Sequence, residues 1–196
     1  MTTNFYNNHA TELIIKYDDA NMSSLHTLLL QFLPKNAKVL DIGFGSGRDL
    51  AFLKKNNYEI WGIDASIKFV KNAKIRFFDI PTHFIQATLP IQTNNLPFQC
   101  KFDAVISIAM WMHLKKDEYA DIIHNIVNLT TKKATIIISY SQGKRINDER
   151  YFEDVDLEYI THLFKQYNFT LIHHTSNSDS LNRETLKWVT VVFKHD

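Results

Sequence analysis

The sequence predicts an α/β fold built around a mostly parallel sheet. Short apolar runs alternate with longer segments of helical period, which is typical of strand-helix-strand units. Three glycines alternate at the point where the first predicted strand passes into a helix. The last two apolar runs are joined by a polar hairpin, residues 175–184, and this predicts an antiparallel end to the sheet.

Each predicted strand is a short apolar run, and each predicted helix has apolar residues on one side. The expected strands are 38–42, 60–63, 83–86, 102–108, 134–140, 170–174 and 186–193. The expected helices are 49–56, 67–77 with Ser66 as N-cap, 117–129 and 155–167. The first 30 residues also look helical, and because they precede the first strand they could cover the ligand site as a lid.

The length of 196 residues is enough for one sizeable core, so we expect a single domain with an N-terminal helical cap, residues 1–33, on an α/β core, residues 34–196. The 22 basic and 21 acidic residues are spread along the chain, so a nucleic-acid partner is not expected. No segment approaches the run of about 18 apolar residues that a membrane span requires. The pattern carries no signal on oligomeric state.

Cys100 is the only cysteine, which excludes a disulfide framework and favours a reducing compartment, so we expect a cytoplasmic protein. His173 and His174 fall in one predicted strand, where adjacent side chains point to opposite faces. We therefore predict no metal site.

The turn Asp41-Ile42-Gly43-Phe44-Gly45-Ser46-Gly47 is the first candidate for ligand binding. Glycines let the backbone approach a ligand closely, and amides at a helix N-terminus can bind a phosphate or a carboxylate. A tight strand-to-helix turn that binds no ligand remains the alternative on this motif alone.

Asp64 ends the second predicted strand, where its carboxylate could accept hydrogen bonds from both hydroxyls of a ribose. A dinucleotide fingerprint starting at Gly43 would need glycine or alanine at position 48, which is Arg48. The glycine turn and the acid together predict a nucleoside pocket, and Arg48 weakens the dinucleotide interpretation.

With Phe102-Asp103-Ala104-Val105 and His113-Leu114, these motifs resemble class I S-adenosylmethionine-dependent methyltransferases over nearly the whole chain. The resemblance implies a doubly wound seven-stranded sheet with the last strand antiparallel, helices on both faces and S-adenosylmethionine as cofactor. The residues it implies around the cofactor are Tyr17, Asp41, Gly43, Phe44, Gly45, Gly47, Arg48, Asp64, Ala65, Ser66, Gln86, Ala87, Thr88 and Ser107. Many members carry an acid after the third strand that meets the adenine amine. Here that segment is Gln86-Ala87-Thr88, so Gln86 or backbone groups would have to serve.

Methyl transfer from a sulfonium is an in-line displacement, so the protein must align the acceptor and exclude water. Aromatic faces suit the partly positive methyl, and Tyr6, Tyr17 and Trp111 are the candidates. His113 follows the fourth predicted strand at the ligand edge, and an ordinary pKa near 6.5 would suit a general base. Packing or loop anchoring is the alternative role for His113.

Arg145 and Arg150 follow the fifth predicted strand and could bind a substrate carboxylate or phosphate with two hydrogen bonds each. Ordinary solvated loop charges are the alternative. Arg183, beside the last strand, is a third candidate for substrate binding.

The acceptor is expected to be a small molecule by elimination. Residues 107–110 lack the Asn/Asp-Pro-Pro-aromatic motif of many adenine and glutamine methyltransferases, and Cys100 is not part of a Pro-Cys nucleophile. A methyltransferase acting on protein or RNA remains an alternative. A protein that binds the cofactor or another nucleoside without turnover is another, because fold alone does not define function.

Overall fold

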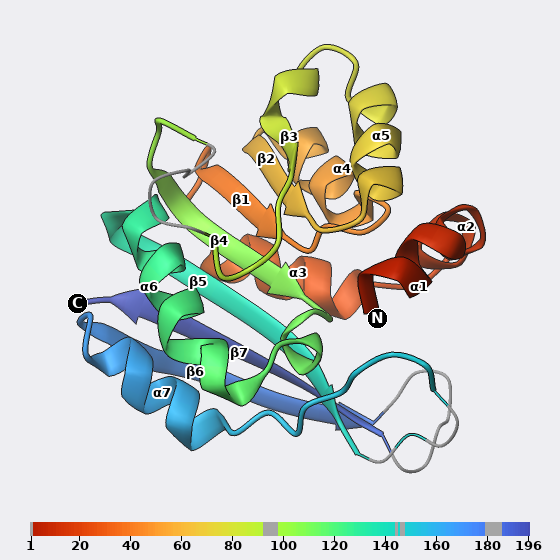
Figure 1. The fold of residues 1–196 in the computed structure, drawn as a ribbon. Coiled ribbons are helices and arrows are strands. Elements are labelled where there is room, and N and C mark those ends of the chain that lie inside the picture. The colour runs from red at the N-terminus through yellow and green to blue at the C-terminus, as the bar shows by residue number, and fades with distance from the viewer. Residues whose placement is uncertain (1, 92–97, 144, 146–147, 179–185) are drawn as a thin grey trace.

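The computed structural model describes residues 2–91, 98–143, 145, 148–178 and 186–196 (Figure 1). In this part of the chain, seven strands form one sheet in the order β3, β2, β1, β4, β5, β7, β6. The strands are β1 (Lys38–Ile42), β2 (Glu59–Asp64), β3 (Phe84–Gln86), β4 (Phe102–Ile108), β5 (Thr130–Gln142), β6 (Phe169–Ser178) and β7 (Lys187–His195).

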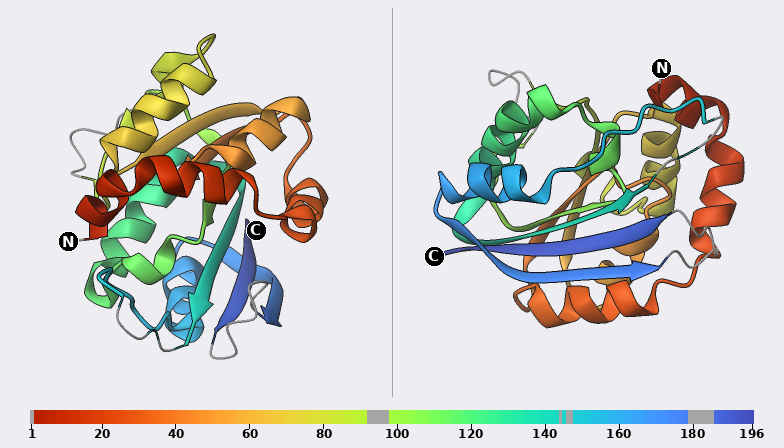
Figure 2. Two further views of the ribbon diagram at one scale, coloured as in Figure 1. Left: turned by 90° about the vertical axis from the view of Figure 1, so that its right-hand side faces the viewer. Right: turned by 90° about the horizontal axis from the view of Figure 1, so that it is seen from below.

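Helices cover both faces of this sheet, as Figures 1 and 2 show. The α-helices are α1 (Thr2–Asn8), α2 (Ala10–Asp18), α3 (Ser23–Phe32), α4 (Arg48–Lys55), α5 (Ile67–Arg76), α6 (Tyr119–Leu129) and α7 (Leu157–Lys165). Short 3-10 turns lie at η1 (Pro81–His83), η3 (Trp111–His113) and η4 (Lys116–Glu118). One apolar cluster joins the sheet to α6 and α7, and a second joins it to α3, α4 and α5. The sheet is therefore buried on both faces, which explains its nearly continuous apolar strands.

The order of the strands defines where a ligand can bind. β1 pairs in parallel with β2, aligning Val39 with Ile60, and with β4, aligning Leu40 with Val105. The chain runs outward from β1 to β3 and then returns to β4 on the other side of β1. Open sheets of this kind bind ligands outside the carboxyl ends of the strands at such a reversal. The glycine turn follows β1 at this point.

The antiparallel end of the sheet is confirmed. β7 lies between β5 and β6 and runs antiparallel to both, so that Thr190 aligns with Ser139 on one side and with Thr175 on the other. The prediction placed residues 175–184 in the hairpin connection, but residues 175–178 belong to β6. Pairing with the long β7 gives these polar residues backbone partners. Residues 179–185 lie outside the described part of the chain.

Local capping sets several helix boundaries. Ser66 accepts a hydrogen bond from the amide of Phe69 and begins α5, as predicted. Asp156 accepts from the amide of Tyr159, so α7 begins at Leu157, two residues later than the apolar period predicted.

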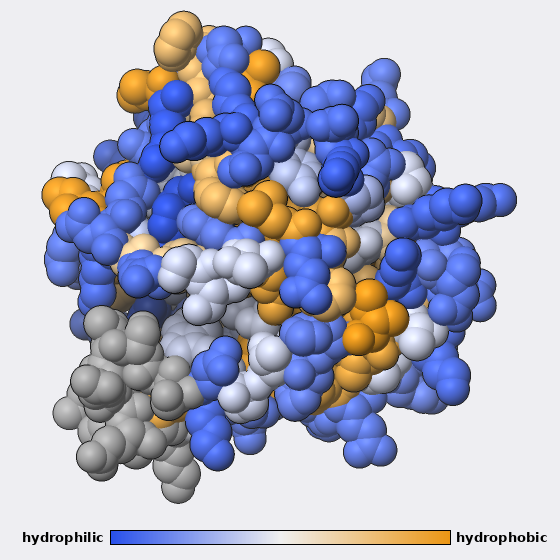
Figure 3. Space-filling view, turned by 180° about the vertical axis from the view of Figure 1, so that it is seen from behind, coloured by the Kyte–Doolittle hydropathy of each residue, from blue (hydrophilic) through white to orange (hydrophobic). Residues whose placement is uncertain are grey.

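The face seen in Figure 3 carries small groups of apolar residues separated by hydrophilic ones. Among the described residues, no helix combines the length and apolarity that crossing a membrane needs. The same residues contain no group of three or more His, Cys, Asp or Glu side chains that could hold a metal ion.

Candidate functional site

The turn between β1 and α4 depends on its glycines. Gly43, Gly45 and Gly47 have φ angles of 79°, 56° and 82°, in the left-handed region that side chains rarely adopt. A Cβ added to Gly43 would lie 2.6 Å from Cγ of Met110, which follows β4. The glycine turn and the segment after β4 are therefore packed directly against each other at the reversal point.

Asp64, the last residue of β2, is bonded to this turn. Its Oδ2 accepts from the amide of Gly45 at 2.9 Å, and its Oδ1 accepts from the amide of Ser66 at 2.8 Å. Burial raises the pKa of Asp64 to about 6, while these two hydrogen bonds act in the opposite direction. The carboxyl group is therefore mostly ionised at pH 7 and held between the turn and the start of α5.

Asp41 is buried in β1 beside the same turn, with 2% of its surface exposed. Its Oδ1 has no hydrogen-bond partner among the described residues. Burial raises the pKa of Asp41 well above its ordinary value, and the nearby carboxylates of Asp49 and Asp64 raise it further. A buried oxygen without a partner is costly, so a ligand donor or cation that reached it would be stabilised.

The segment after β3 offers mainly backbone groups. The side-chain amide of Gln86 donates to the carbonyl of Ala65 at 3.2 Å, and the amide of Ala87 donates to the carbonyl of Asp64 at 3.1 Å. Thr88 is exposed. These contacts join the ends of β2 and β3 next to Asp64 without a carboxylate in residues 84–91.

Helices α1 and α2 close over this edge of the sheet (Figure 2). The ring of Tyr17, in α2, lies 3.5 Å from the place where Gly45 would carry a Cβ. Arg48 donates from Nη1 to the carbonyl of Tyr17 at 2.8 Å, and Ser66 donates to Oδ1 of Asn7 in α1 at 2.8 Å. The two helices are thus bonded to the start of α4 and the start of α5.

Arg48 is held by a buried ion pair with Asp49, whose carboxylate accepts from Nε and Nη2 of Arg48 at 3.0 and 2.8 Å. The same carboxylate accepts from Nε2 of His26, in α3, at 2.8 Å. Burial would raise the pKa of Asp49, but the bonds from His26 and Arg48 hold it below its ordinary value. The guanidinium of Arg48 is therefore engaged with Asp49 and α2. The predicted contact of Arg48 with the cofactor stays a prediction.

A second polar group joins α1 to the segments after β4 and β5. Tyr6 donates its hydroxyl to Nε2 of His113 at 2.8 Å and accepts from Nη1 of Arg150 at 3.3 Å. Nδ1 of His113 donates to the carbonyl of Tyr151 at 2.8 Å. Because a carbonyl only accepts, Nδ1 carries the proton of the neutral ring and Nε2 presents its lone pair to Tyr6.

The electrostatics of His113 differ from the sequence expectation. Burial lowers the pKa of His113 to about 4, and the cations Arg150 and Arg145 act in the same direction. The ring is therefore neutral at pH 7, and its conjugate acid is too strong for efficient removal of a proton from a hydroxyl or an ammonium group. The prediction of a base with a pKa near 6.5 is corrected, because sequence position does not show how deeply a ring is buried.

Arg145 and Arg150 belong to a compact group of charges and rings. Arg150 forms a bidentate ion pair with Asp148, with Nε to Oδ1 at 2.8 Å and Nη2 to Oδ2 at 2.6 Å. The guanidinium of Arg150 lies 5.0 Å from the ring centroid of Phe152, and that of Arg145 lies 3.7 Å from the same centroid. Arg145 also donates to Oγ of Ser141. The side chain of Arg150 is only 21% exposed, so it is not the solvated loop charge of the alternative.

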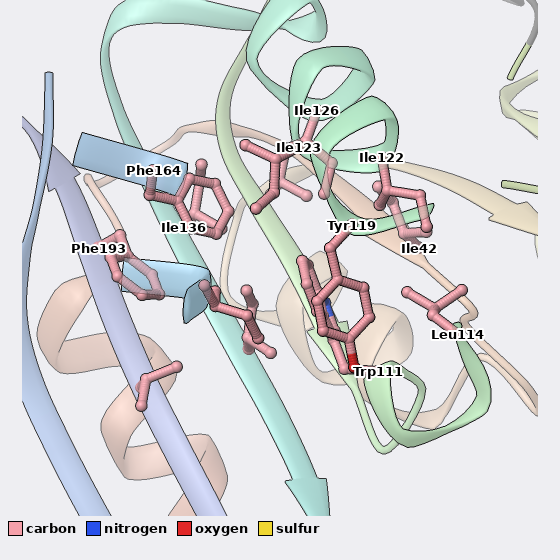
Figure 4. Packing of buried hydrophobic residues seen from close by; sticks show 14 of the residues in the cluster. Ile42, Trp111, Leu114, Tyr119, Ile122, Ile123, Ile126, Ile136, Phe164 and Phe193 are labelled. Carbon is pink, nitrogen blue, oxygen red and sulfur yellow. The ribbon is translucent and has the colours of Figure 1, made fainter. Parts of the chain in front are cut away.

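Trp111 does not reach this edge of the sheet. Its indole has no exposed surface and packs against Tyr119, with ring centroids 5.4 Å apart, and against Phe164 at 6.3 Å. Figure 4 shows it in the cluster below α6. The proposed contact of Trp111 with the transferred methyl is therefore corrected to a packing role, since η3 turns the indole toward the core while His113 stays at the edge.

Two predicted cofactor contacts also lie in the core. The ring of Phe44 packs against Phe84, with centroids 5.8 Å apart, and would meet a Cβ on Gly62 at 2.5 Å. Ser107 is 1% exposed and donates to the carbonyl of Ile42 at 3.1 Å, which joins β4 to β1. Their side chains support the turn and do not line an open surface. Arg183 lies outside the described residues.

Sequence reasoning missed four residues that complete these contacts. Asn7, His26, Asp148 and Phe152 all lie outside the motifs, in the N-terminal helices or the polar stretch after β5. The only sequence signal was the acid two positions before Arg150, and proximity in the chain does not show pairing. The remaining contacts join residues far apart in the sequence.

The comparisons with known proteins agree with this architecture. Residues 39–133, just under half of the chain, match the family model of the methyltransferase domain, and this span contains the glycine turn, Asp64 and His113. No curated protein matches the chain. The strand order and the glycine turn, together with the match of residues 39–133 to a methyltransferase domain, agree with the predicted fold of class I S-adenosylmethionine-dependent methyltransferases.

Three solved structures share the fold at low identity. The chain is 16% identical to the 1,6-didemethyltoxoflavin N1-methyltransferase of Burkholderia thailandensis, with a TM-score of 0.71 over 100% of this chain and 87% of the other. It is 15% identical to the magnesium protoporphyrin IX methyltransferase of Synechocystis PCC 6803, with a TM-score of 0.72 over 99% and 98%. It is 18% identical to a TehB-like methyltransferase of Corynebacterium glutamicum, with a TM-score of 0.69 over 99% and 98%. The first two were crystallised with bound S-adenosylhomocysteine.

Proposed function

We propose that this enzyme transfers the methyl group of S-adenosylmethionine to an O, N or S atom of a small molecule. The observation that carries the proposal is Asp64, which ends β2 beside the glycine turn and bonds to the amides of Gly45 and Ser66. A carboxylate there is suited to the two hydroxyls of a ribose. The methyltransferases of the comparison that act on a didemethyltoxoflavin and on magnesium protoporphyrin IX support a small-molecule acceptor.

The residues around the turn fit the other parts of the cofactor. The buried, unpartnered Oδ1 of Asp41 suits the ammonium of its methionine end. Ala65, Gln86 and the amide of Ala87 lie beside Asp64 and suit the adenine, with Gln86 in place of the usual acid. The bound cofactor would supply an activated methyl on a sulfonium. The glycine turn must lose its contact with Tyr17 where the cofactor enters, because that ring covers Gly45.

Tyr6, His113 and Arg150 are the residues proposed to meet the acceptor. Nε2 of His113 accepts a hydrogen bond and can orient a hydroxyl or amine without removing its proton. Arg150 adds positive charge at the same place, which favours an acceptor atom that is already anionic. The chain thus positions the acceptor and excludes water, and both tasks accelerate a displacement.

We further propose a domain organisation and a cellular location for the chain. We assign α1 to α3 as a cap that forms one domain with the α/β core, since Tyr6, Asn7 and Arg48 join them directly. A cytoplasmic location is proposed from the single cysteine. A methyltransferase of protein or RNA, or a protein that binds the cofactor without turnover, are the competing functions.

Calorimetric titration with S-adenosylmethionine and with NAD tests the central proposal. We expect S-adenosylmethionine to bind and NAD not to bind. Asp64→Ala should weaken binding about tenfold or more, the scale of a lost hydrogen bond to a charged group. Asp79→Ala, which removes a carboxylate that is 49% exposed, is the matched control. No binding of S-adenosylmethionine to the wild type, or equal affinity in Asp64→Ala, would refute the assignment.

Turnover of a metabolite library separates an enzyme from a cofactor-binding protein. The wild type should release S-adenosylhomocysteine with at least one small acceptor, while peptide and RNA libraries stay inactive. His113→Ala should lower kcat for that acceptor because the neutral ring orients it. Equal kcat in the variant would remove His113 from the acceptor site.

A further inference from the structure

The carboxylate of Asp148 binds the guanidinium of Arg150 with the same two-point geometry that a ligand carboxylate would use. Both oxygens of Asp148 are engaged by Nε and Nη2 of Arg150, the fork geometry that arginine uses for carboxylates. The two side chains are about equally buried, at 20% and 21% exposure. The bonds from Arg150 lower the pKa of Asp148, so Asp148 is an anion at neutral pH.

A second guanidinium and flat apolar rings surround this pair. Arg145 lies over the ring of Phe152 and acts electrostatically on both Asp148 and His113. Arg150 lies 5.0 Å from the ring centroid of Phe5. Both guanidinium groups therefore lie next to rings that could contact an apolar body.

The same group touches the residues proposed to meet the acceptor. Nη1 of Arg150, which Asp148 does not use, donates to the hydroxyl of Tyr6, and that hydroxyl reaches His113. The ring of His113 lies 4.7 Å from that of Phe152. A molecule bound to Arg150 would therefore extend toward the end of β4 and the glycine turn.

We propose that Arg150, with the charge of Arg145 beside it, binds a carboxylate of the acceptor, and that Asp148 holds this position until the acceptor displaces it. The inference rests on the proposed function for the presence of an acceptor. A carboxylate is assigned because a carboxylate of the chain itself already fills the fork in two-point geometry. The acceptor is accordingly a small carboxylic acid with an apolar, flat body. When the acceptor displaces Asp148, the ion pair between Asp148 and Arg150 is lost and the carboxylate of Asp148 is hydrated instead. A variant without this carboxylate should therefore bind the acceptor more tightly.

The test uses benzoate, benzamide and phenyl phosphate as probes of the full chain saturated with S-adenosylhomocysteine, followed by NMR chemical shifts or calorimetry. We expect benzoate to bind at least tenfold more tightly than its neutral isostere benzamide, and more tightly than phenyl phosphate. Asp148→Asn should tighten benzoate binding about fivefold or more, since the competing anion is gone. Arg150→Gln should abolish the preference for benzoate over benzamide, and Arg150→Lys should retain part of it because the charge stays while the fork is lost.

Lys54→Gln is the control, because it removes a cation of an exposed ion pair with Asp79 and should leave benzoate binding unchanged. Thermal unfolding checks that each variant folds. If a variant does not fold, the comparison of benzoate with benzamide binding to the wild type still tests the proposal.

Equal binding of benzoate and benzamide to the wild type, or weaker benzoate binding in Asp148→Asn, would overturn the proposal. Stronger binding of phenyl phosphate would reassign the site to phosphate. Loss of S-adenosylhomocysteine binding in Arg150→Gln would assign Arg150 to the cofactor instead. Failure of S-adenosylhomocysteine to bind the wild type would count against the proposed function, not against the carboxylate preference alone.

Discussion

At the scale of single residues, burial changes the chemistry of Asp64 and His113 in opposite directions. The pKa of Asp64 is raised to about 6 and that of His113 is lowered to about 4, in each case because burial disfavours the charged form. At neutral pH the acid is ionised and the imidazole is neutral. The ionised carboxylate of Asp64 can accept hydrogen bonds from ribose hydroxyls, and the neutral imidazole of His113 accepts one from Tyr6.

The two groups also have opposite effects on stability. Between about pH 4 and 6 the folded state holds the proton of Asp64 more tightly than the unfolded chain, so this group makes stability fall as the pH rises. Affinity for S-adenosylmethionine should nevertheless rise over this range, because the ionised carboxylate is the form that accepts the ribose hydroxyls.

For His113 the unfolded chain binds the proton more tightly, so its contribution to stability is complete above about pH 6.5 and is lost as the pH falls toward 4. The loss attributable to this group is up to about 3 kcal/mol. Urea unfolding of the wild type and His113→Asn from pH 7 to pH 4 measures it. We expect the variant to lose less stability than the wild type on acidification, and identical slopes would contradict the buried neutral ring. His174→Asn, at an exposed position of β6, should keep the wild-type slope.

At the scale of elements, the N-terminal helices are joined to the core by charges that lie in different parts of the chain. Arg48 donates to the end of α2, and Arg76 of α5 pairs with Asp18 at 2.8 Å and also donates to the carbonyl of Ser46 in the turn. In α1, Tyr6 bonds to His113 and to Arg150, and Asn7 accepts from the hydroxyl of Ser66. α2 is therefore held by Arg48 and Arg76 next to the glycine turn, and α1 is held by His113, Arg150 and Ser66.

Removing the charge of Asp49 should weaken this attachment. Asp49→Asn leaves Arg48 without its carboxylate in a site where the two side chains are 19% and 8% exposed, and we expect a loss of about 2 kcal/mol or more. Residues 1–33 should become more susceptible to proteolysis than the core. Asp79→Asn breaks the exposed pair with Lys54 and should cost less than about 1 kcal/mol. A cost for Asp49→Asn no larger than that control would show that the ion pair does not hold the cap.

At the scale of the whole molecule, the reversal of strand order between β1 and β4 places the glycine turn, Asp64 and Met110 at one edge of the sheet. A ligand that binds this edge contacts the ends of β1 and β2 together with α2. Its binding free energy therefore stabilises the folded chain as a unit, because the unfolded chain has no such edge.

We expect S-adenosylmethionine at about 100 times its Kd to stabilise the protein by about 2.7 kcal/mol. For a chain of this size that corresponds to a rise in Tm of about 5 °C or more. Thermal unfolding with and without the cofactor measures the shift, and Asp64→Ala at the same cofactor concentration should show a smaller one. An unchanged Tm of the wild type at saturating concentration would contradict binding at this edge.

Most strands were predicted within a few residues because their signal is local. The run of residues 102–108 matches β4 at both ends, and 38–42 matches β1. The motif also predicted that Gly43, Gly45, Gly47 and Asp64 lie together, because parallel strands of a repeated strand-helix unit end at the same edge. The contacts of the cap were beyond such reasoning, since the pairs Tyr6 with His113 and His26 with Asp49 join residues 107 and 23 positions apart.

The sequence by itself determined the fold class, the glycine turn and the acid at the end of β2, because each depends on the local period or on neighbouring residues of one unit. Only the tertiary structure decided which side chains are accessible and how they are charged. It placed Trp111 in the core, lowered the pKa of His113 and paired Arg150 with Asp148. The physical reason is that burial and Coulomb interactions depend on distances in space, and these are set by the packing of segments that the sequence keeps apart.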